Sequence, residues 1–385
     1  MLKGSATLLR NAVDDRKSEG FVRELLSRAG ITIGGSAPHD LVVHDPRFYT
    51  RLLRDGSLGM GEAYMDGWWD SPAVDQLVCR LLTAKLDEVV RHNYKLIAHT
   101  LKAKVLNLQT VARAFQVGEK HYDIGNDLYE AMLDGRMMYT CAYWKNASTL
   151  DAAQEAKLDL VCRKIGLKAG MKVLELGCGW GGFAKFAAEN YGAEVTGLTV
   201  SKEQVAIGKE RCRGLPVDIS ARDYRDAQGL YDAVISIGIM EHIGPKNYRT
   251  YMEVVDRCMK PDGIALVHTI AGNRSIKHME PWFNKYIFPN AVLPTISALG
   301  KSMEQLLVLE DVHNIGPHYD RTLMAWLANF EAAWPSLKAK YGERFYRMWR
   351  YYLLTSAAGF RIRYTQLFQL VMTRTGTPQP DCRLS

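Results

Sequence analysis

The chain has 385 residues, 47% of them hydrophobic, and a formal net charge of +7. This length allows two domains or one large α/β domain with an appendage. The charge favours an anionic surface as a partner but is too small to require nucleic acid. Seven dispersed cysteines without a Cys-x-x-Cys pair predict reduced thiols and a cytoplasmic protein, and the ten histidines lack zinc-like spacing with them. No segment reaches the ~18 uncharged apolar residues of a membrane-spanning helix, which predicts a soluble protein.

The N-terminal residues predict a small mixed unit that is separate from the rest of the chain. Residues 15–30 have the spacing of a short amphipathic helix that ends at Gly30. Its expected core-facing side chains are Phe21, Leu25, Leu26 and Ala29. Three stretches predict short strands and loops: 31–35, 40–45 and 56–69. We expect Trp68 and Trp69 in the core rather than in a ligand platform.

Residues 80–115 contain seven Lys or Arg residues against two acids, interleaved with leucines and valines. This composition is typical of a pair of basic amphipathic helices. An ordinary packing helix with a solvated face is the alternative that periodicity leaves open. The net positive charge favours an anionic membrane surface as the partner. A connection follows at 116–125, and the polar, aromatic and sulfur side chains of 122–144 predict a cap over a site.

Beyond residue 147 the chain alternates between helices and strands. Ser148 or Thr149 can cap a helix whose apolar face contains Ala153, Leu158, Val161, Cys162 and Ile165. Strands are then expected at 172–177, 193–199, 217–221, 232–238 and 264–270. Helices are expected at 181–190, 201–213 and 246–259, followed by a Pro-Asp-Gly turn. This repetition predicts an α/β fold with a parallel, doubly wound sheet.

Residues 271–318 are too irregular for another strand–helix–strand unit. A long insertion at the carboxyl edge of a sheet usually forms a substrate lid. The remaining predicted elements are helices 321–334 and 338–357 and strands 306–312 and 366–372.

The first strand of this array runs into a turn rich in glycine. Gly177, Gly179, Gly181 and Gly182 follow within six positions, and Glu175 precedes them. Backbone without Cβ atoms lets a ligand approach closely. The spacing departs from the dinucleotide G-x-G-x-x-G motif, and an acid before the glycines suits a positively charged ligand. S-adenosylmethionine is therefore favoured over NAD, with a ligand-free turn as the bland alternative. Ser201 and Gln204 form a capping box at the start of the second helix.

Several long motifs then resemble one family in the order in which that family carries them. They include GSLGMGEAYMDGWW, EKHYDIGNDLY, YTCAYW, LELGCGWGG, MEHIGPKNY, HTI and HYDRTLMAW. The chain resembles the cyclopropane-fatty-acyl-phospholipid synthases, whose relatives, the mycolic acid cyclopropane synthases, lack the N-terminal unit. The resemblance implies a class I methyltransferase (Rossmann-like) domain behind a smaller N-terminal α+β lipid-docking domain. The expected division is 1–115 for docking, 116–125 as linker and 126–385 for catalysis, with the lid at 271–318.

The resemblance also implies the methyl donor and its site. S-adenosylmethionine would lie over the glycine turn. The implied contact residues are Tyr139, Thr140, Glu175, Gly177, Cys178, Gly179, Gly181, Thr199, Gln204, Arg222 and Asp223. Thr199 stands where many methyltransferases have a ribose-binding acid, so Gln204 is expected to take the ribose.

The implied acceptor is the cis double bond of an acyl chain in a membrane phospholipid. Its π electrons would attack the methyl group, and a proton must leave before a cyclopropane ring closes. The family's base is a bicarbonate ion held by Cys141, Glu241, His268, Tyr319 and the backbone of Ile270. An anion beside an apolar carbocation stabilises the positive charge and can accept the proton. Without the family, His268 would be a core histidine and Cys141 a small hydrophobe.

The expected partners are a second copy of the chain and a membrane. The resemblance implies a homodimer that lies at the inner face of the cytoplasmic membrane and contacts an anionic phospholipid bilayer. A sterol or small-amine methyltransferase is the alternative enzyme, although it would not need the YTCAYW and HTI motifs. A non-catalytic lipid-binding protein is the second alternative, which the intact glycine turn disfavours.

Overall fold

The computed structural model describes residues 18–85 and 125–384, and these form two compact units. The first, called the N-terminal unit, comprises 18–85, 280–287 and 331–364 of the described residues. The second, called the sheet unit, comprises 125–279, 288–330 and 365–384. The sequence had suggested that 280–287 and 331–364 belong to the catalytic domain, but they pack with the N-terminal residues instead. The predicted linker at 116–125 lies almost wholly outside the described residues.

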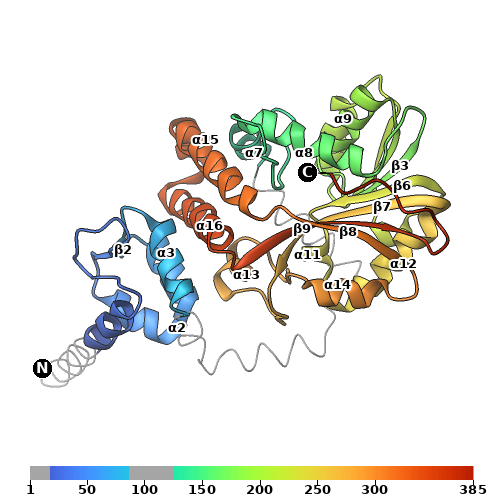
Figure 1. The fold of residues 1–385 in the computed structure, drawn as a ribbon. Helices are drawn as coiled ribbons and strands as arrows, with labels where there is room; N and C mark the ends of the chain where they lie inside the picture. Colours follow the sequence, from blue (N-terminus) through green and yellow to red (C-terminus); the bar gives the residue numbers. More distant parts are fainter. Residues whose placement is uncertain (1–17, 86–124, 385) are drawn as a thin grey trace, which may run out of the picture. The chain divides into compact units, whose positions relative to one another are not determined.

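A mostly parallel sheet organises the sheet unit (Figure 1). Within the described residues its strand order is β5-β4-β3-β6-β7-β9-β8. Every neighbouring pair from β5 to β7 is parallel, and β9 is antiparallel to both β7 and β8. The strands are β3 (Lys172–Leu176), β4 (Glu194–Thr199), β5 (Val217–Ala221), β6 (Tyr231–Ile237), β7 (Met259–Gly272), β8 (Val308–Asn314) and β9 (Thr365–Thr373). The chain direction across the sheet reverses at β3, so the carboxyl ends of β3 and β6 border the natural ligand crevice.

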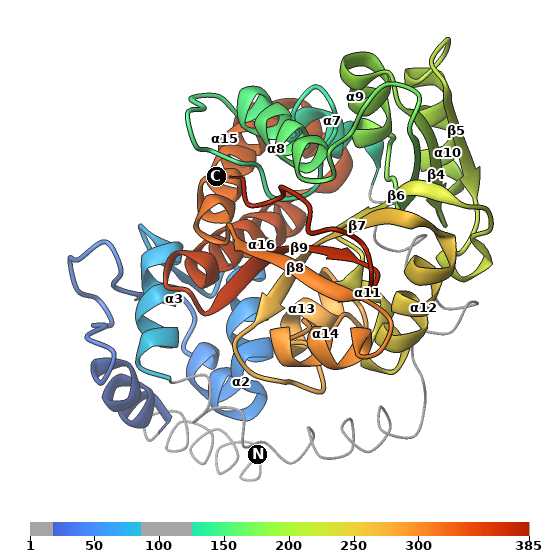
Figure 2. The ribbon, with the colours of Figure 1, turned by 45° about the vertical axis from the view of Figure 1, so that its right-hand side comes forward.

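Helices cover both faces of this sheet (Figure 2). On one face lie α8 (Leu150–Lys164) and α9 (Gly182–Tyr191), and on the other α12 (Tyr248–Cys258) and α14 (Ile296–Met303). The strands are buried on both sides, because Val173 packs into the core under α8 and α9 while Leu174 packs into the core under α12. Fully burying each large apolar side chain contributes about 1.5–3 kcal/mol. The two cores therefore hold the sheet edge in place for ligands.

The predicted elements of the sheet unit are largely confirmed. The expected strands and helices between 172 and 259, and the last two strands, end within two residues of the observed bounds. Thr149 caps α8 by accepting from the Ala152 N–H at 3.3 Å, and the predicted apolar face of that helix is buried. The two long helices predicted at 321–334 and 338–357 are observed as α15 (Pro317–Tyr341) and α16 (Glu343–Arg361). The break predicted at 335–337 is wrong, because α15 continues through Pro335 and ends at Tyr341.

Two expectations for the sheet unit are wrong. The turn predicted at 261–263 lies inside the long strand β7, at an irregularity where β7 has three more residues than β6 between the pairs Met259–Tyr231 and Ile264–Ala233. The segment 271–318 is not irregular throughout. It contains the helices α13 (Pro281–Tyr286) and α14, which were not predicted, and the predicted strand β8, which pairs with β9 at the edge of the sheet.

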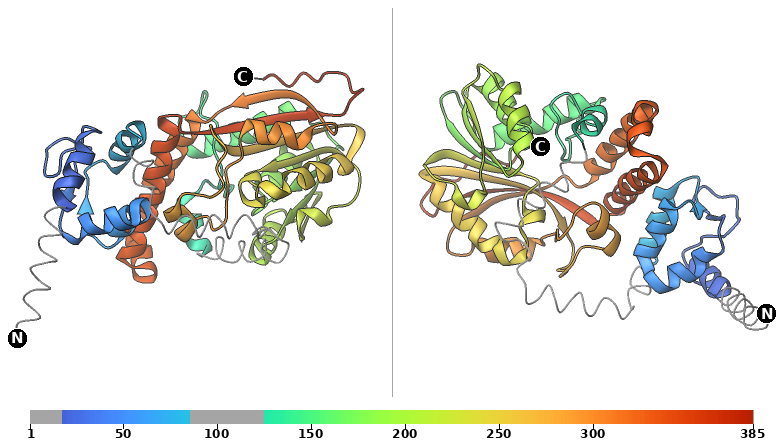
Figure 3. Two further views of the ribbon diagram at one scale, coloured as in Figure 1. Left: turned by 90° about the horizontal axis from the view of Figure 1, so that it is seen from below. Right: turned by 180° about the vertical axis from the view of Figure 1, so that it is seen from behind.

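The N-terminal unit is mainly helical (Figure 3). A short ladder pairs β1 (Val42–Val43) with β2 (Trp69–Asp70), and α16 packs beside α2 (Arg47–Met65) and α3 (Val74–Thr83). The Glu62 carboxylate of α2 accepts from Arg51 at 2.6 Å, from Lys285 at 2.5 Å and from Tyr286 at 2.8 Å. These bonds attach α13 to α2, which explains why 280–287 belongs to this unit.

The strands and loops predicted at 56–69 are wrong for 56–65, because α2 continues to Met65 through a kink at Gly56. The remaining residues, 66–69, form a turn and the start of β2. The reason is tertiary packing. A Cβ at Gly61 would lie 2.4 Å from Cδ1 of Trp282, so a glycine is needed where α2 meets α13. Burial of this contact outweighs the low helix propensity of glycine.

Three aromatic predictions in this unit have different outcomes. Phe21 is 53% exposed, which corrects its placement in the core, and Val22 is buried in its stead. The burial stripe runs through Val22, Leu25, Leu26 and Ala29 in steps of three and four residues, so Phe21 falls at its edge. Trp69 is buried as predicted. Trp68 is half-buried, with the guanidinium groups of Arg47 and Arg51 at 4.6 and 4.7 Å from its ring.

Of the basic stretch 80–115, only 80–85 lies within the described residues. The helix pair expected there is therefore outside them. Among the described helices, none combines the length and apolar character needed to cross a bilayer.

Candidate active site at the carboxyl edge of the sheet

The glycine turn, residues 175–182, connects β3 to α9. Gly177, Gly179 and Gly181 all have positive φ angles, at 76°, 53° and 78°. The N–H groups of Gly177 and Cys178 donate to the Leu198 carbonyl of β4 at 2.8 and 2.9 Å, which fixes the turn to the neighbouring strand. A Cβ on Gly177 would lie 2.1 Å from Cδ1 of Ile239, whereas a Cβ on Gly179 would meet nothing within 4 Å. Gly177 is thus required by packing, and Gly179 borders open space that a ligand can enter.

Glu175 is the first residue of this segment, lies in β3 and is only 2% exposed. Burial raises the pKa of its carboxyl to about 8, opposed by the nearby Lys157 ammonium and by a hydrogen bond from the Ala184 N–H. Its Oε2 atom has no hydrogen-bond partner within the described residues. A buried acceptor oxygen beside an open backbone cradle fits a ligand that carries donors or positive charge, as S-adenosylmethionine does.

The ends of β4 and β5 hold the next predicted donor contacts. The Ser201 hydroxyl caps α10 (Lys202–Arg211) by accepting from the Gln204 N–H at 3.3 Å, as predicted. The reciprocal half of the capping box is wrong, because the Gln204 side-chain oxygen accepts from the Thr199 hydroxyl at 2.6 Å. Thr199 and Gln204 thus act as one bonded pair at the end of β4.

Beyond β5 the two predicted contacts differ in exposure. Asp223 is 1% exposed, and its Oδ1 accepts from the N–H and the Nε of Arg225, both at 2.9 Å. Its Oδ2 lacks a partner in the part of the chain that the structure describes. The Arg222 side chain is exposed, and the backbone N–H of Arg222 donates to the Thr199 carbonyl at 3.0 Å.

A row of aromatic rings starts at the glycine turn. Trp180 contacts Tyr129 of α7 (Asn126–Met132), with ring centroids 5.1 Å apart, and Tyr129 contacts Tyr139 at 5.1 Å. Tyr139 contacts Trp326 at 5.3 Å, and Trp326 meets Tyr319 edge-on at 5.8 Å. The electron-rich faces of such rings can stabilise a cation nearby. Only Tyr139 and Tyr319 of this row were predicted as site residues, because the others look like ordinary core aromatics.

The residues predicted to hold the anion, called the anion set below, are Cys141, Glu241, His268, Ile270 and Tyr319. Glu241 lies in the short helix α11 (Met240–Ile243) after β6, and its Oε1 accepts from the Ile270 N–H at 2.5 Å. Burial raises the pKa of this carboxyl to about 7. The Oε2 atom of Glu241 is buried and has no described partner.

His268 stands two residues before Ile270 on β7, so both side chains project from the same face of the strand. Its Nδ1 lies 3.3 Å from the Gln369 amide nitrogen of β9, and its Nε2 has no partner among the residues described. Burial lowers the pKa of His268 well below 6.5, so the ring is neutral. A neutral imidazole with one engaged nitrogen is positioned to bind a polar ligand with the other.

Cys141 and Tyr319 are linked through α15. The Cys141 thiol is fully buried, its Sγ is 3.2 Å from the Ala142 carbonyl, and burial raises its pKa so that it stays protonated. The Ala142 N–H and the Trp144 indole N–H donate to the Thr322 hydroxyl at 3.1 and 2.9 Å. Thr322 lies one helical turn after Tyr319, so the same turn of α15 carries Tyr319 and anchors Cys141.

Lys157 is a residue of this region that was not predicted. It lies on α8, is fully buried, and donates to the Thr140 hydroxyl at 2.9 Å. Burial lowers the pKa of its ammonium to about 8, against the raising effect of Asp134, Cys141 and Glu175. A lysine inside the apolar face of the predicted helix was the sequence signal that could have identified it.

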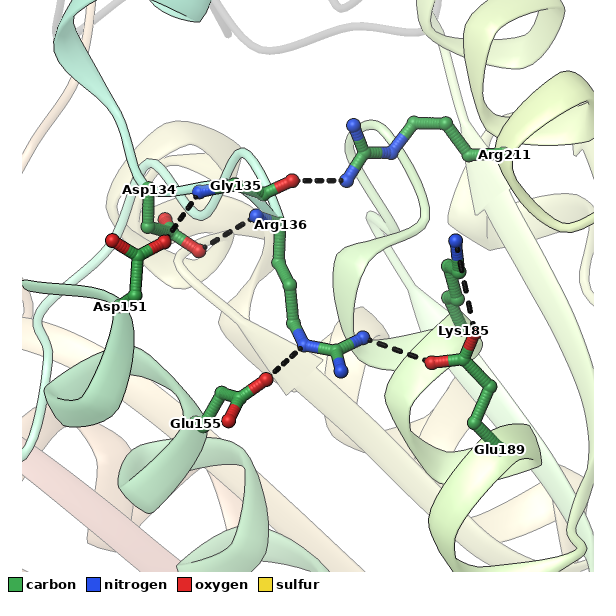
Figure 4. A pocket seen from close by; sticks show the side chains of 8 residues that line it. All are labelled: Asp134, Gly135, Arg136, Asp151, Glu155, Lys185, Glu189 and Arg211. Carbon is green, nitrogen blue, oxygen red and sulfur yellow. Dashed lines mark hydrogen bonds and ion pairs between the residues drawn. The ribbon is translucent and has the colours of Figure 1, made fainter.

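A separate pocket of about 310 Å³ lies away from these residues (Figure 4). Its walls come from Asp134, Gly135, Arg136, Asp151, Glu155, Lys185, Glu189 and Arg211. The Arg136 guanidinium bonds to Glu155 at 2.9 Å and to Glu189 at 3.1 Å, so its charge is already paired with two carboxylates. Neither the predicted donor contacts nor the anion set line it. Among the described residues, no group of three or more His, Cys, Asp and Glu side chains is arranged to hold a metal ion.

The strand order, the antiparallel β9 and the glycine turn define a class I methyltransferase fold. Solved structures agree: the cyclopropane synthase MmaA2 from Mycobacterium tuberculosis has 28% identity and a TM-score of 0.64, and covers 70% of this chain and 100% of its own. Mycolic acid cyclopropane synthase CmaA1, complexed with SAH and CTAB, has 29% identity and a TM-score of 0.63 over 68% of this chain and 98% of that one.

The chain belongs to the mycolic acid cyclopropane synthetase family, whose model matches residues 109–370. It is 49% identical to the cyclopropane-fatty-acyl-phospholipid synthase of Escherichia coli K12, over 94% of this chain and 95% of that protein. It is also 31% identical to the tuberculostearic acid methyltransferase UfaA1 of Mycobacterium tuberculosis, over 98% of this chain and 93% of that one.

Proposed function

We propose that this protein transfers a methylene group from S-adenosylmethionine to the cis double bond of acyl chains in membrane phospholipids and so forms a cyclopropane ring. The match of 49% to the Escherichia coli synthase, over nearly the whole of both chains, supports this substrate class. The observation that carries the chemistry is the buried Glu241 carboxylate, which is bonded to Ile270 on the strand that also carries His268. An alkene has no N–H or O–H group that a base must activate before methyl transfer, so it is a suitable acceptor for this site.

The glycine turn, Glu175, the Thr199–Gln204 pair and Asp223 would hold the donor. The unpartnered oxygens of Glu175 and Asp223 would accept hydrogen bonds from it, and Tyr139 and Thr140 would contact it from the segment before α8. S-adenosylmethionine supplies an electrophilic methyl group when bound. The residues of this chain orient that group toward the acceptor and exclude water.

We further propose that the base is a bicarbonate ion held by the anion set. The protonated Cys141 thiol, the neutral His268 ring and the Tyr319 hydroxyl can all donate to an anion. Glu241, with its pKa raised to about 7, can donate as well when protonated. A pocket of donors holds a negative ion better than it abstracts a proton itself.

The proposed reaction has two steps, methyl transfer to the alkene and proton removal with ring closure. The alkene π pair would form a bond to the methyl carbon while the bond between sulfur and that carbon breaks, so S-adenosylhomocysteine would leave with the S–C electron pair. A carbocation would remain at the other alkene carbon. Bicarbonate removes a proton from the added methyl group, and the released C–H pair closes the ring. The aromatic row from Trp180 to Tyr319 would stabilise the intermediate charge. The relative complexed with CTAB, a long-chain quaternary ammonium, is consistent with a site for an apolar cation.

The test uses the full chain, S-adenosylmethionine and vesicles of unsaturated phospholipid. Mass spectrometry should show a gain of one CH₂ per double bond, and proton NMR should show cyclopropane rather than branched methylene signals. Repeating the assay in carbonate-depleted buffer with graded bicarbonate tests the base. A branched product would favour a methyltransferase of another lipid type, and turnover indifferent to bicarbonate would remove the ion from the mechanism.

We also propose that the protein is a homodimer which docks on anionic bilayers at the inner face of the membrane. The net charge of +7 and the basic composition of 80–115 support docking. Co-sedimentation with anionic vesicles should weaken as salt rises, because ions screen Lys and Arg charges. Equal binding to neutral vesicles would contradict docking by charge, and a monomer in analytical ultracentrifugation would contradict the dimer.

A further inference from the structure

Helix α8 carries two lysines that are both buried, Lys157 and Lys164, which lie seven residues apart on the same face. Lys164 forms a direct ion pair with Asp311 of β8, with Nζ 2.8 Å from Oδ2. Lys157 instead donates to the neutral Thr140 hydroxyl. Within the described residues Lys157 forms no ion pair with a carboxylate. An ammonium buried in this way costs free energy, so its presence calls for a function.

The acceptor of this bond occupies a central position. The Thr140 methyl group packs against Gly238, where a Cβ would lie only 2.9 Å from it, and Gly238 directly follows β6. Thr140 is thus wedged between Lys157 and the strand end that leads to Glu241. Its neighbours in the chain are Tyr139, which belongs to the aromatic row, and Cys141, which belongs to the anion set.

A second side chain of α8 holds the same segment. The Gln154 amide nitrogen donates to the Met138 carbonyl at 3.2 Å and to the Thr140 carbonyl at 2.9 Å. Gln154 lies one turn before Lys157 and is also fully buried. Gln154 and Lys157 thus hydrogen-bond to two carbonyls and one hydroxyl of 138–140. This segment has no regular secondary structure of its own.

We propose that Lys157 is a positioning residue of the reaction, which holds Thr140 and through it keeps Tyr139 in the aromatic row and Cys141 in the anion set. The inference rests on the proposed function for its catalytic readout. Lys157 would act through Thr140 and would touch neither the donor nor the acceptor. Its ammonium also lies near Asp134, Cys141 and Glu175, which raise its pKa against the lowering effect of burial.

The main variant is Lys157→Met, which keeps the length of the side chain and removes its charge and donor. We expect turnover to fall ~30-fold or more and the dissociation constant for SAH, measured by calorimetry, to rise ~5-fold or more. The melting temperature should stay within about 4 °C of wild type or rise, because replacing a buried charge by an apolar side chain of similar volume is often neutral or stabilising. A purely structural lysine predicts instead that stability falls together with activity.

The matched control is Lys164→Met on the same helix face. It breaks a direct ion pair, so stability should fall while SAH affinity of the folded protein stays within about twofold of wild type. A double-mutant cycle with Thr140→Val completes the test. If Lys157 acts through Thr140, the double variant should lose about as much as the worse single variant, whereas losses that multiply would overturn the proposal.

The remaining outcomes also decide. Lys157→Met with wild-type turnover and SAH affinity would overturn the proposal, and so would an equal loss of SAH affinity in Lys164→Met. If wild-type protein makes no cyclopropane, the proposed function fails and SAH affinity alone decides the role of Lys157. If Lys157→Met does not fold, Thr140→Val with the lysine intact carries the test, and wild-type SAH affinity in that variant would contradict the proposal.

Discussion

The glycine turn is one continuous segment, 175–182, whereas the anion set comes from four segments that are widely separated in the sequence. Both regions bury a glutamate with one unpartnered oxygen, judged by the described residues, and burial raises the pKa of Glu175 to about 8 and of Glu241 to about 7. The turn is held by backbone geometry next to a strand. The anion set is held by long-range packing of α8, α11, α15 and β7. A single local change should therefore disable the turn, while the anion set should respond to changes at each contributing group.

The largest expected effect separates the two regions. Glu241→Gln should lower turnover by ~10²-fold or more, because the amide beside the base can neither ionise nor exchange a proton as the carboxyl group does. SAH affinity should be unchanged, because Glu241 lies outside the donor contacts. Rate assays and calorimetry measure the two quantities.

The control for this variant is Glu194→Gln, which removes an exposed carboxylate at the start of β4. It should leave turnover near wild type. Near-normal turnover in Glu241→Gln would remove the role given to Glu241, and a parallel loss of SAH affinity would mean that the two regions are not separable.

The second effect tests the glycine turn. Gly177→Ala places a Cβ 2.1 Å from Cδ1 of Ile239 at a φ of +76°, so the free energy of unfolding should fall by ~2–4 kcal/mol and SAH affinity should fall as well. Gly170→Ala is the matched control, with a φ of +78° and nothing within 4 Å of the new Cβ. It should cost only ~1–2 kcal/mol and leave SAH affinity unchanged. Equal behaviour of the two variants in denaturant titration and calorimetry would refute the close approach at Gly177.

The third effect is a pH dependence of stability. The pKa of Glu241 is about 7 in the folded protein against an ordinary value of 4.5, so the folded state binds this proton more tightly. Wild-type stability therefore decreases through this group as pH rises from 4.5 to 7. Glu241→Gln cannot ionise and should be more stable than wild type by ~1–3 kcal/mol at pH 8, with the difference shrinking toward pH 5. Urea denaturation at several pH values measures it, and a constant difference would contradict the raised pKa.

The smallest effect concerns Cys141. Cys141→Ser keeps a donor in place of the thiol, so turnover should fall only ~10-fold and recover partly when bicarbonate is added. No covalent enzyme intermediate should appear in mass spectra, because the buried thiol stays protonated. Cys79→Ser, in the N-terminal unit, is the control and should behave as wild type. Complete loss without rescue, together with a trapped adduct, would point to a thiol nucleophile instead.

Local patterns were sufficient for much of the sheet unit. The periodicity between 172 and 259 predicted strands and helices to within two residues. Residue type alone identified the Ser201 cap and limited the cap of α8 to Ser148 or Thr149, of which the structure shows Thr149. Such features depend on residues within a few positions of one another. The same holds for the glycine turn, where positive φ angles at Gly177 and Gly179 follow from the motif.

Other features depended on partners far along the chain. The helical course of 56–65 is decided by Trp282, more than two hundred residues away, and the side-chain partner of Gln204 by competition between Ser201 and Thr199. The grouping of Glu241 and Ile270 in one site could be proposed only through the family resemblance, and the hydrogen bond between them was not predicted, because α11 and β7 meet only in the folded sheet.

The sequence by itself therefore determined the alternation of strands and helices, the donor turn and the family, since each is written in short contiguous segments. Only the tertiary structure decided that Lys157 holds Thr140, that Trp180, Tyr129 and Trp326 form a row, and that β8 pairs with β9. The physical reason is that burial and hydrogen-bond partners depend on which elements pack together. The sequence around a lysine or a tryptophan does not tell whether the side chain lies in the core or in a site, because its neighbours in space decide that.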